Sequence, residues 1–268
     1  MMVAQHSPYS HILDYLASRW SDAPLPELLE HLAPFGYEFW EALQTAPETA
    51  DYTTPENQAY YLLRIFPHHI EQLYHTLSEV PSQAIELAFS GKTLKACFFG
   101  AGPAPEVIGL LMYLGANAPH VESVHATVLD KYTETWQDIQ HNLTRARLAP
   151  AYWQQGTLTL ESHTLDNQAP FQWGQLDPSV RNAIGTANLL VFQNCLSDLT
   201  DPDQFIANFC ELLKNIRADS LIVFNDLKYD RVRGLLESLE TSAYAVGIKK
   251  EFTSWKDGLV TYKSRIES

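Results

Sequence analysis

Apolar and polar residues follow two different patterns along the chain, and the pattern changes near residue 90. After this point, short apolar runs alternate with segments whose apolar residues recur at helical spacing. This alternation predicts parallel βαβ units with right-handed crossovers, in which ligands bind at the carboxyl ends of the strands. The expected strands are 94–99, 124–129, 156–161, 187–192 and 219–225, and the expected helices are 105–114, 134–147, 202–214 and 229–239.

Two further extended segments, 243–248 and 258–263, follow the last expected helix. No convincing helical pattern separates them, so we expect an antiparallel pair at the end of the sheet. The predicted fold class is therefore α/β, with a mostly parallel sheet and an antiparallel last strand.

The region before residue 90 has a helical pattern, in which residues such as Ile12 and Leu16 recur at turn spacing. Prolines punctuate this region, and we expect each of them to begin or end a short helix. A break at Gly91 separates this region from the first expected strand. The sequence thus predicts an all-helical cap over 1–90 and an α/β domain over 91–268.

Composition limits the class of protein. The chain has 268 residues, of which 46% are hydrophobic, and this length holds one full α/β domain with an extension. No apolar run approaches the roughly 18 residues that a membrane span needs. Residues 1–6 lack the basic and apolar segments of a secretory signal, so we expect a cytoplasmic protein with no membrane partner.

Charge and metal-ligand spacing disfavour two further classes of function. Residues 1–90 contain two basic and twelve acidic residues, and the net charge of the whole chain is −14. This excess repels phosphate backbones and leaves no basic stripe, so a nucleic-acid partner is disfavoured. His68, His69 and His75 with Glu71 match neither a zinc helix motif nor a facial triad, so no metal site is expected. The three cysteines lack C-x-x-C spacing, which favours reduced thiols.

A glycine turn follows the first expected strand. Gly100 and Gly102 remove side chains where the backbone must turn tightly and approach a ligand, and Pro103 and Pro105 fix the chain before helical periodicity starts. The N–H groups at the helix start then face the ligand. This layout predicts a nucleotide-type ligand site, although a tight strand-to-helix turn in any α/β protein can also need two glycines.

An acidic residue, Asp130, ends the second expected strand, where a carboxylate can accept hydrogen bonds from two ribose hydroxyls. In the dinucleotide motif G-x-G-x-x-G the third glycine would fall at position 105, but this chain has Pro105 there. Close packing of the helix against a pyrophosphate loop is therefore disfavoured, and NAD is the less favoured ligand.

The segment 98–106 with Asp130 after it resembles the first two motifs of class I S-adenosylmethionine-dependent methyltransferases. The resemblance covers roughly residues 92 to 265 and implies a Rossmann-like methyltransferase sheet with S-adenosyl-L-methionine as its cofactor. The family usually carries an acid at the position of Phe98 and often a third glycine at that of Ala104. The residues that we expect at the cofactor are Tyr61, Arg64, Phe99, Gly100, Ala101, Gly102, Pro103, Glu106, Asp130, Lys131, Thr164, Leu165, Gln193 and Asn194.

Polar residues after the later strands are candidates for chemistry. In the resembled fold, the segment that contains Asn194 and Asp198 faces the methyl group and its acceptor. Asn194 could orient an acceptor and Asp198 could take its proton, whereas the alternative is that both cap the helix that starts at Pro202. The resemblance places an adenine contact after the third strand, where Asp166 is a candidate, although a loop aspartate that forms a turn is an equal alternative.

The helical region offers two more candidates ahead of the glycine loop. Tyr60 and Tyr61 are adjacent on a helix, so at most one naturally faces the core and the other is free to face a ligand. Arg64 could meet the methionine carboxylate, whereas the alternative is a salt bridge with Glu71 or a nearby acid. We expect the region 1–90 to cover the cofactor and select the acceptor.

Three functions fit these observations. The first is a methyltransferase that acts on a small-molecule or protein acceptor. The second is a methyltransferase-like binding or scaffold protein without transfer activity, which the departures at Phe98 and Ala104 motivate. The third is an NAD-dependent oxidoreductase, against which Pro105 and the expected antiparallel end of the sheet count.

Overall fold

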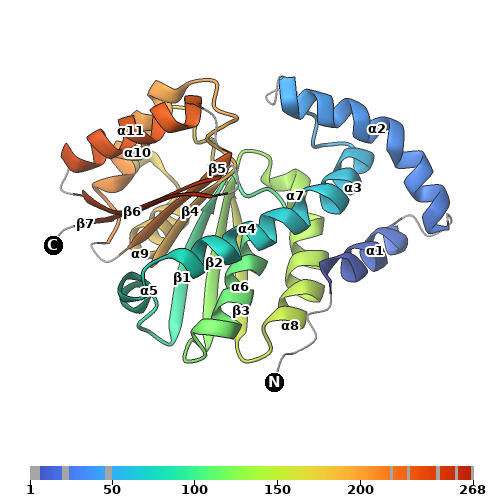
Figure 1. Cartoon of the computed structure of the whole chain (residues 1–268), viewed down its shortest axis with the longest axis horizontal. Coiled ribbons are helices and arrows are strands. Elements are labelled where there is room, and N and C mark those ends of the chain that lie inside the picture. The colour runs from blue at the N-terminus through green and yellow to red at the C-terminus, as the bar shows by residue number, and fades with distance from the viewer. Residues whose placement is uncertain are drawn as a thin grey trace.

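The structure is a computed structural model that describes residues 7–19, 24–45, 50–217, 220–227, 230–245, 248–256 and 259–266. In this part of the chain, seven strands form one sheet in the order β3-β2-β1-β4-β5-β7-β6. Figure 1 shows the sheet between two groups of helices. The strands are β1 (Thr93–Phe99), β2 (Ser123–Asp130), β3 (Thr157–Thr164), β4 (Leu189–Gln193), β5 (Leu221–Leu227), β6 (Ile248–Lys256) and β7 (Leu259–Ile266).

The first five strands are parallel and confirm the predicted βαβ alternation. Strand β7 lies between β5 and β6 and runs antiparallel to both. The expected strand at 243–248 is wrong in its position, because α11 continues to Ala245 and β6 begins at Ile248. Helix α11 therefore includes the first residues of the segment that the sequence suggested to be extended.

Helices between the strands mostly match the expected ranges, with one change and three additions, α8, η3 and α9. The expected helix 134–147 starts as an α-helix and continues as a wider π-helix, and α9 adds a helix before β4 that the sequence did not predict. The helices after β1 are α6 (Pro105–Asn117), α7 (Thr133–Ile139), the π-helix η2 (Gln140–Leu148), α8 (Ala149–Tyr152), the 3-10 helix η3 (Trp173–Gln175), α9 (Pro178–Thr186), α10 (Pro202–Leu213) and α11 (Asp230–Ala245).

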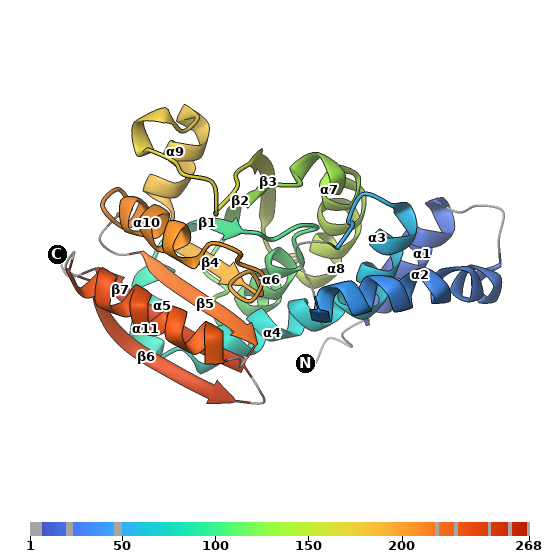
Figure 2. The same cartoon turned by 90° about the horizontal axis from the view of Figure 1, so that it is seen from above.

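The described residues before β1 form helices and no strand, as the sequence predicts. Figures 1 and 2 show α1 and α2 at the outer end of the molecule, away from the sheet. Pro34 contradicts the expectation that each proline begins or ends a helix, because it lies inside α2. Its exposed position lets water solvate the carbonyl group that loses its helical partner. The helices are α1 (Pro8–Arg19), α2 (Leu25–Thr45), α3 (Pro55–Arg64), α4 (Phe66–Glu79) and α5 (Ser82–Ala88).

The core lies on both faces of the sheet, and the two faces alternate along each strand. Phe98 belongs to the face that packs on α4 and α6, whereas its neighbour Phe99 belongs to the face that packs on α9, α10 and α11. Helix α4 thus shares one continuous core with the sheet. A Cβ atom at Gly109 of α6 would lie 2.5 Å from the carbonyl oxygen of Ile70, so the backbones of α4 and α6 approach closely. Among the described helices, none is long and apolar enough to cross a membrane.

Candidate functional site

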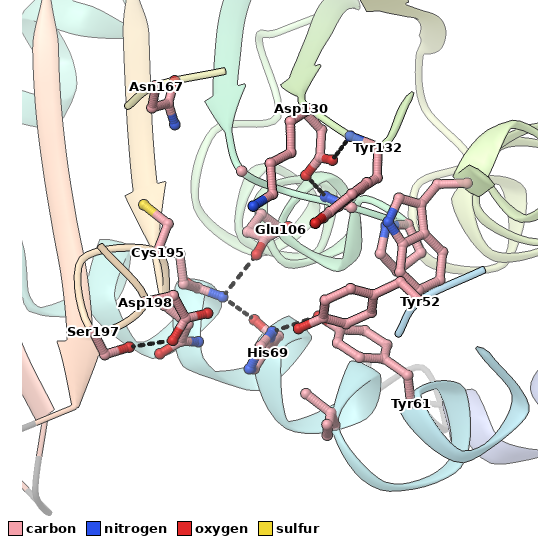
Figure 3. Close-up of a pocket in the computed structure, with 18 of the residues that line it drawn as sticks. Tyr52, Tyr61, His69, Glu106, Asp130, Tyr132, Asn167, Cys195, Ser197 and Asp198 are labelled. Carbon is pink, nitrogen blue, oxygen red and sulfur yellow. Dashed lines mark hydrogen bonds between the residues drawn. The ribbon is translucent and has the colours of Figure 1, made fainter. Parts of the chain in front are cut away.

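A cavity of about 950 Å³ opens at the carboxyl ends of β1, β2 and β4. Its walls come from the glycine loop after β1, the ends of β2 and β4, and helices α3 and α4 (Figure 3). The residues expected from the sequence that line it are Tyr61, Arg64, Gly100, Gly102, Pro103, Glu106, Asp130, Lys131, Leu165, Gln193, Asn194 and Asp198.

The glycine loop adopts left-handed backbone conformations at three positions. Gly100 and Gly102 have φ angles of 65° and 48°, and Ala104 has a φ angle of 66° immediately before α6. A Cβ atom at Gly102 would also meet the indole Nε1 of Trp136 at 3.2 Å. Both the backbone angle and the close approach therefore favour glycine at position 102, whereas the alanine at position 104 adopts a strained conformation.

Asp130 ties this loop to the end of β2. Its Oδ2 accepts a hydrogen bond from the N–H of Gly102 at 2.9 Å, and its Oδ1 accepts one from the N–H of Tyr132 at 2.6 Å. Burial raises the pKa of this carboxyl, whereas the two backbone donors and Lys131 lower it. Each carboxylate oxygen can accept a further hydrogen bond, so Asp130 shapes the loop and still presents acceptors to the cavity.

The end of β4 is joined to α4 by a network of buried and half-buried amides. Gln72 and Asn194 exchange two hydrogen bonds, because Asn194 Nδ2 donates to Gln72 Oε1 at 2.7 Å and Gln72 Nε2 donates to Asn194 Oδ1 at 3.2 Å. Gln193 Nε2 donates to the carbonyl oxygen of His69 at 2.9 Å. Asn194 has a φ angle of 50°, so this network holds a strained residue in the cavity wall.

Asp198 lines the cavity and accepts a hydrogen bond from Ser197 Oγ at 3.2 Å. The alternative that it caps the following helix is wrong, because Asp201 is the N-cap of α10 and accepts from the N–H of Gln204 at 2.9 Å. Asp226 is fully buried at the end of β5 and accepts a hydrogen bond from the backbone N–H of Leu196 at 2.7 Å. This contact holds the loop that contains Asp198.

Aromatic rings form one wall of the cavity. Tyr52, Tyr61 and Trp136 pack with ring centroids 5.5 to 6.2 Å apart, and Tyr132 lies 5.9 Å from Tyr52. Tyr61 also contacts His69, whose Nδ1 is 3.2 Å from the tyrosine hydroxyl. Burial lowers the pKa of His69 to about 3, so this histidine is neutral at physiological pH.

Sequence reasoning missed several of these residues. Trp136 lies in the first turns after Asp130, so its place near the carboxyl end of β2 was a usable signal. Tyr52 and Gln72 precede the sheet, and nothing in their local pattern indicates which strand they meet. Gln168 reaches across from the loop after β3, where its Oε1 accepts from the N–H of Thr200 at 2.6 Å.

Three of the residues that we expected at the cofactor lie outside the cavity. Phe99 is in the core on the opposite face of the sheet, where its ring stacks on Phe192 with centroids 4.2 Å apart. Ala101 is buried in the core with 4% of its surface exposed. Thr164 is the last residue of β3 and is exposed, but it does not line the cavity. The alternation of faces along the strands accounts for Phe99, since its neighbour Phe98 points the other way.

Arg64, at the end of α3, lines the cavity, and the alternative of a salt bridge with Glu71 or a nearby acid is not found among the described residues. Its guanidinium has no ion pair with any residue that the structure describes. Lys131 is the second cation of the cavity wall, with its ammonium 4.7 Å from the centre of the Tyr132 ring. Both basic groups are therefore open to an anionic part of a ligand.

Comparison with solved structures identifies the fold. The chain is similar to the protein LaPhzM (13% identity, TM-score 0.52, 87% of this chain and 70% of that one) and to an O-methyltransferase family protein from Burkholderia thailandensis (10% identity, TM-score 0.51, 89% and 71%). It is also similar to an S-adenosylmethionine-dependent methyltransferase from Clostridium acetobutylicum (8% identity, TM-score 0.50, 87% and 99%). No family model and no curated protein matches the sequence. The chain therefore has the Rossmann-like fold of class I methyltransferases.

Proposed function

We propose that this protein is a cytoplasmic S-adenosylmethionine-dependent methyltransferase that acts on a small molecule. The observation that carries the proposal is the hydrogen bond from Gly102 to Asp130, which places a left-handed glycine loop and a carboxylate at one edge of the cavity. A nucleoside with an amino-acid tail needs both groups. Three free cysteines, of which Cys97 is fully buried, support a reducing compartment.

The residues of the cavity fit this cofactor. Asp130 would accept hydrogen bonds from the ribose hydroxyls, and the loop from Leu165 to Asn167 would border the adenine. Arg64, which has no ion pair with a described residue, would meet the carboxylate of the amino-acid end. The cavity is also large enough, since its volume falls at the upper end of the range of roughly 300–1,000 Å³ typical of ligand sites.

When bound, the cofactor supplies a methyl group from its positively charged sulfur. The rest of the cofactor is the leaving group and becomes a neutral thioether. The protein then needs mainly to position the acceptor and exclude water. Tyr52, Tyr61 and Trp136 provide an apolar wall for this purpose, and burial raises the pKa of Tyr52 well above its ordinary value, so its hydroxyl stays neutral.

We assign the acceptor-facing roles to Asn194 and Asp198. The exchange of hydrogen bonds with Gln72 fixes the amide of Asn194, which leaves one N–H and one lone pair for an acceptor. Asp198 would take a proton from an acceptor hydroxyl or amine that must lose one. Aromatic walls on a cavity of about 950 Å³ favour a small planar acceptor over a protein or nucleic-acid chain.

Product formation tests the proposal. The full chain would be incubated with S-adenosylmethionine and a panel of phenolic, carboxylic and amine metabolites, and S-adenosylhomocysteine release would be measured. We expect release with at least one acceptor and a large loss in Asp198→Asn. Tight cofactor binding without transfer to any acceptor would instead favour a binding protein that uses the same fold.

A further inference from the structure

The first strand lacks an acid at the position where the resembled family usually has one. Phe98 occupies this position, is completely buried and packs in the core that joins the sheet to α4 and α6. Its phenyl ring carries no negative charge and does not line the cavity, so it cannot replace a carboxylate there. If a cationic group of a ligand is bound at this end of the cavity, another residue must supply the negative charge.

Glu106 is a carboxyl with an unused oxygen in the cavity wall. It lies in the first turn of α6, only 2% of its surface is exposed, and Oε1 accepts a long hydrogen bond of 3.4 Å from Gln193 Nε2. Its Oε2 is buried and has no hydrogen-bond partner among the residues that the structure describes. An unsatisfied buried acceptor destabilises the folded protein, so its presence calls for a donor that the described residues do not provide.

We propose that Glu106 binds the α-ammonium group at the amino-acid end of S-adenosylmethionine, in place of the acid missing at Phe98. The inference rests on the proposed function, because it assigns a residue of this chain to one end of that cofactor. Figure 3 shows the Glu106 side chain between Asp130 and the Cys195–Asp198 loop, facing the cavity.

The order of the strands supports placing the amino-acid end of the cofactor at Glu106. Asp130 ends β2 and the loop around Leu165 follows β3, so the nucleoside is expected over the β3–β2 part of the sheet. The amino-acid tail must then extend the other way, across β1 toward β4. Glu106 lies on that side, because its carboxyl contacts Gln193 at the end of β4.

The groups that interact electrostatically with Glu106 include no positive charge that would pair with it. Asp130 of β2, Tyr61 of α3 and Cys195 after β4 all interact electrostatically with it, and each is acidic or neutral. His69 of α4 is neutral as well. Burial raises the pKa of Glu106 to about 8, so without a cation beside it this carboxyl is mostly protonated at neutral pH. An incoming ammonium group would ionise it and supply the missing donor.

The test compares three ligands that differ at the proposed contact. S-adenosylmethionine and S-adenosylhomocysteine both carry the amino-acid end, whereas 5′-methylthioadenosine lacks it. Affinities would be measured by calorimetry for the wild type, Glu106→Gln and Glu134→Gln. Glu134 is a matched control, because it is an exposed glutamate at the same position of the first turn of α7.

We expect Glu106→Gln to weaken both ligands that carry the ammonium group by about 10- to 100-fold, as for a lost hydrogen bond to a charged group. Its affinity for 5′-methylthioadenosine should stay at the wild-type value, which also shows that the variant is folded. Glu134→Gln should bind all three ligands as the wild type does. Glu106→Asp, which withdraws the charge by one methylene, should lose affinity for the same two ligands.

Other results would overturn the assignment. Equal losses for all three ligands would make Glu106 a structural residue, and a loss for S-adenosylmethionine alone would place it at the sulfonium. Unchanged affinities in Glu106→Gln would remove Glu106 from the site while leaving the proposed function intact. Absence of binding of any of the three ligands to the wild type would instead refute the proposed function itself, and this inference with it.

Discussion

The backbone N–H of Gly102 lies 2.9 Å from Asp130 Oδ2 and donates a hydrogen bond to it. This contact joins the turn after β1 to the end of β2, and so couples the two sequence motifs that suggested a nucleotide site. The carboxylate therefore has two tasks, since it fixes the loop and remains an acceptor for a ligand. Substitution of Asp130 should therefore affect both stability and binding.

Replacement of Asp130 by alanine should weaken cofactor binding by about 1.5–3 kcal/mol, because hydrogen bonds to a charged group are lost. It should also destabilise the fold by about 1–3 kcal/mol, since the N–H groups of Gly102 and Tyr132 lose their acceptor. Calorimetry and denaturant unfolding measure the two effects. Asp203→Ala, at an exposed position of α10, serves as the control, and full affinity in folded Asp130→Ala would remove this residue from the site.

A valine at position 102 should abolish cofactor binding and leave helical content near the wild-type value. Its side chain would occupy space beside Trp136, and a β-branched residue is strained at a φ angle of 48°. Circular dichroism and ligand titration check this prediction. Gly174→Val is the matched control, because nothing lies within 4 Å of a Cβ atom at that glycine. Tight binding by Gly102→Val would mean that the glycine serves only the turn.

The contact between α4 and α6 predicts opposite effects for two alanine substitutions in the same helix. Gly109→Ala should destabilise the protein by about 1–3 kcal/mol, because the new Cβ atom would lie 2.5 Å from the carbonyl oxygen of Ile70. Gly115→Ala meets its nearest atom at 3.5 Å and should be stabilising by up to about 1 kcal/mol through helix propensity. Equal effects in thermal unfolding would contradict the close approach of α4.

The pH dependence of stability should report the burial of Glu106. Its pKa is raised from 4.5 to about 8 in the folded protein, so the folded state holds a proton that the unfolded state releases in this range. Stability should therefore fall as pH rises from 4.5 toward 8, by up to ~1.4 kcal/mol per pH unit from this group, and should not fall further above pH 8 on its account.

Glu106→Gln removes this titration, so its stability relative to the wild type should increase between pH 5 and pH 8. Unfolding at several pH values checks the prediction, with Glu134→Gln as the control for a first-turn glutamate that is exposed. A constant difference between the wild type and Glu106→Gln across this range would mean that the carboxyl is ionised in the folded state.

The sequence was a good guide where the fold depends on local pattern. The apolar runs predicted β1 to β5, and the turn chemistry of Gly100 and Gly102 identified one wall of the cavity. Asp130 was placed from its position after a strand, because parallel strands bring their carboxyl ends to one edge. Each of these features depends on the pattern of a short segment of the chain, where local rules apply.

The remaining walls depend on contacts between distant segments, which a single sequence does not specify. Gln72 meets Asn194 across 122 residues, and its polar side chain on an amphipathic helix looked like any exposed position. Phe99 was misplaced because glycine-loop residues were grouped by sequence proximity, whereas successive strand residues face opposite sides. Glu106 was included from the motif, but only its burial reveals that one oxygen lacks a partner.

Calorimetric titration of the full chain with S-adenosylhomocysteine and, separately, with NAD tests the central claim most directly. We predict saturable binding of S-adenosylhomocysteine with one site per chain, lost in Gly102→Val, and no binding of NAD. Absence of S-adenosylhomocysteine binding, or tighter binding of NAD, would contradict the account.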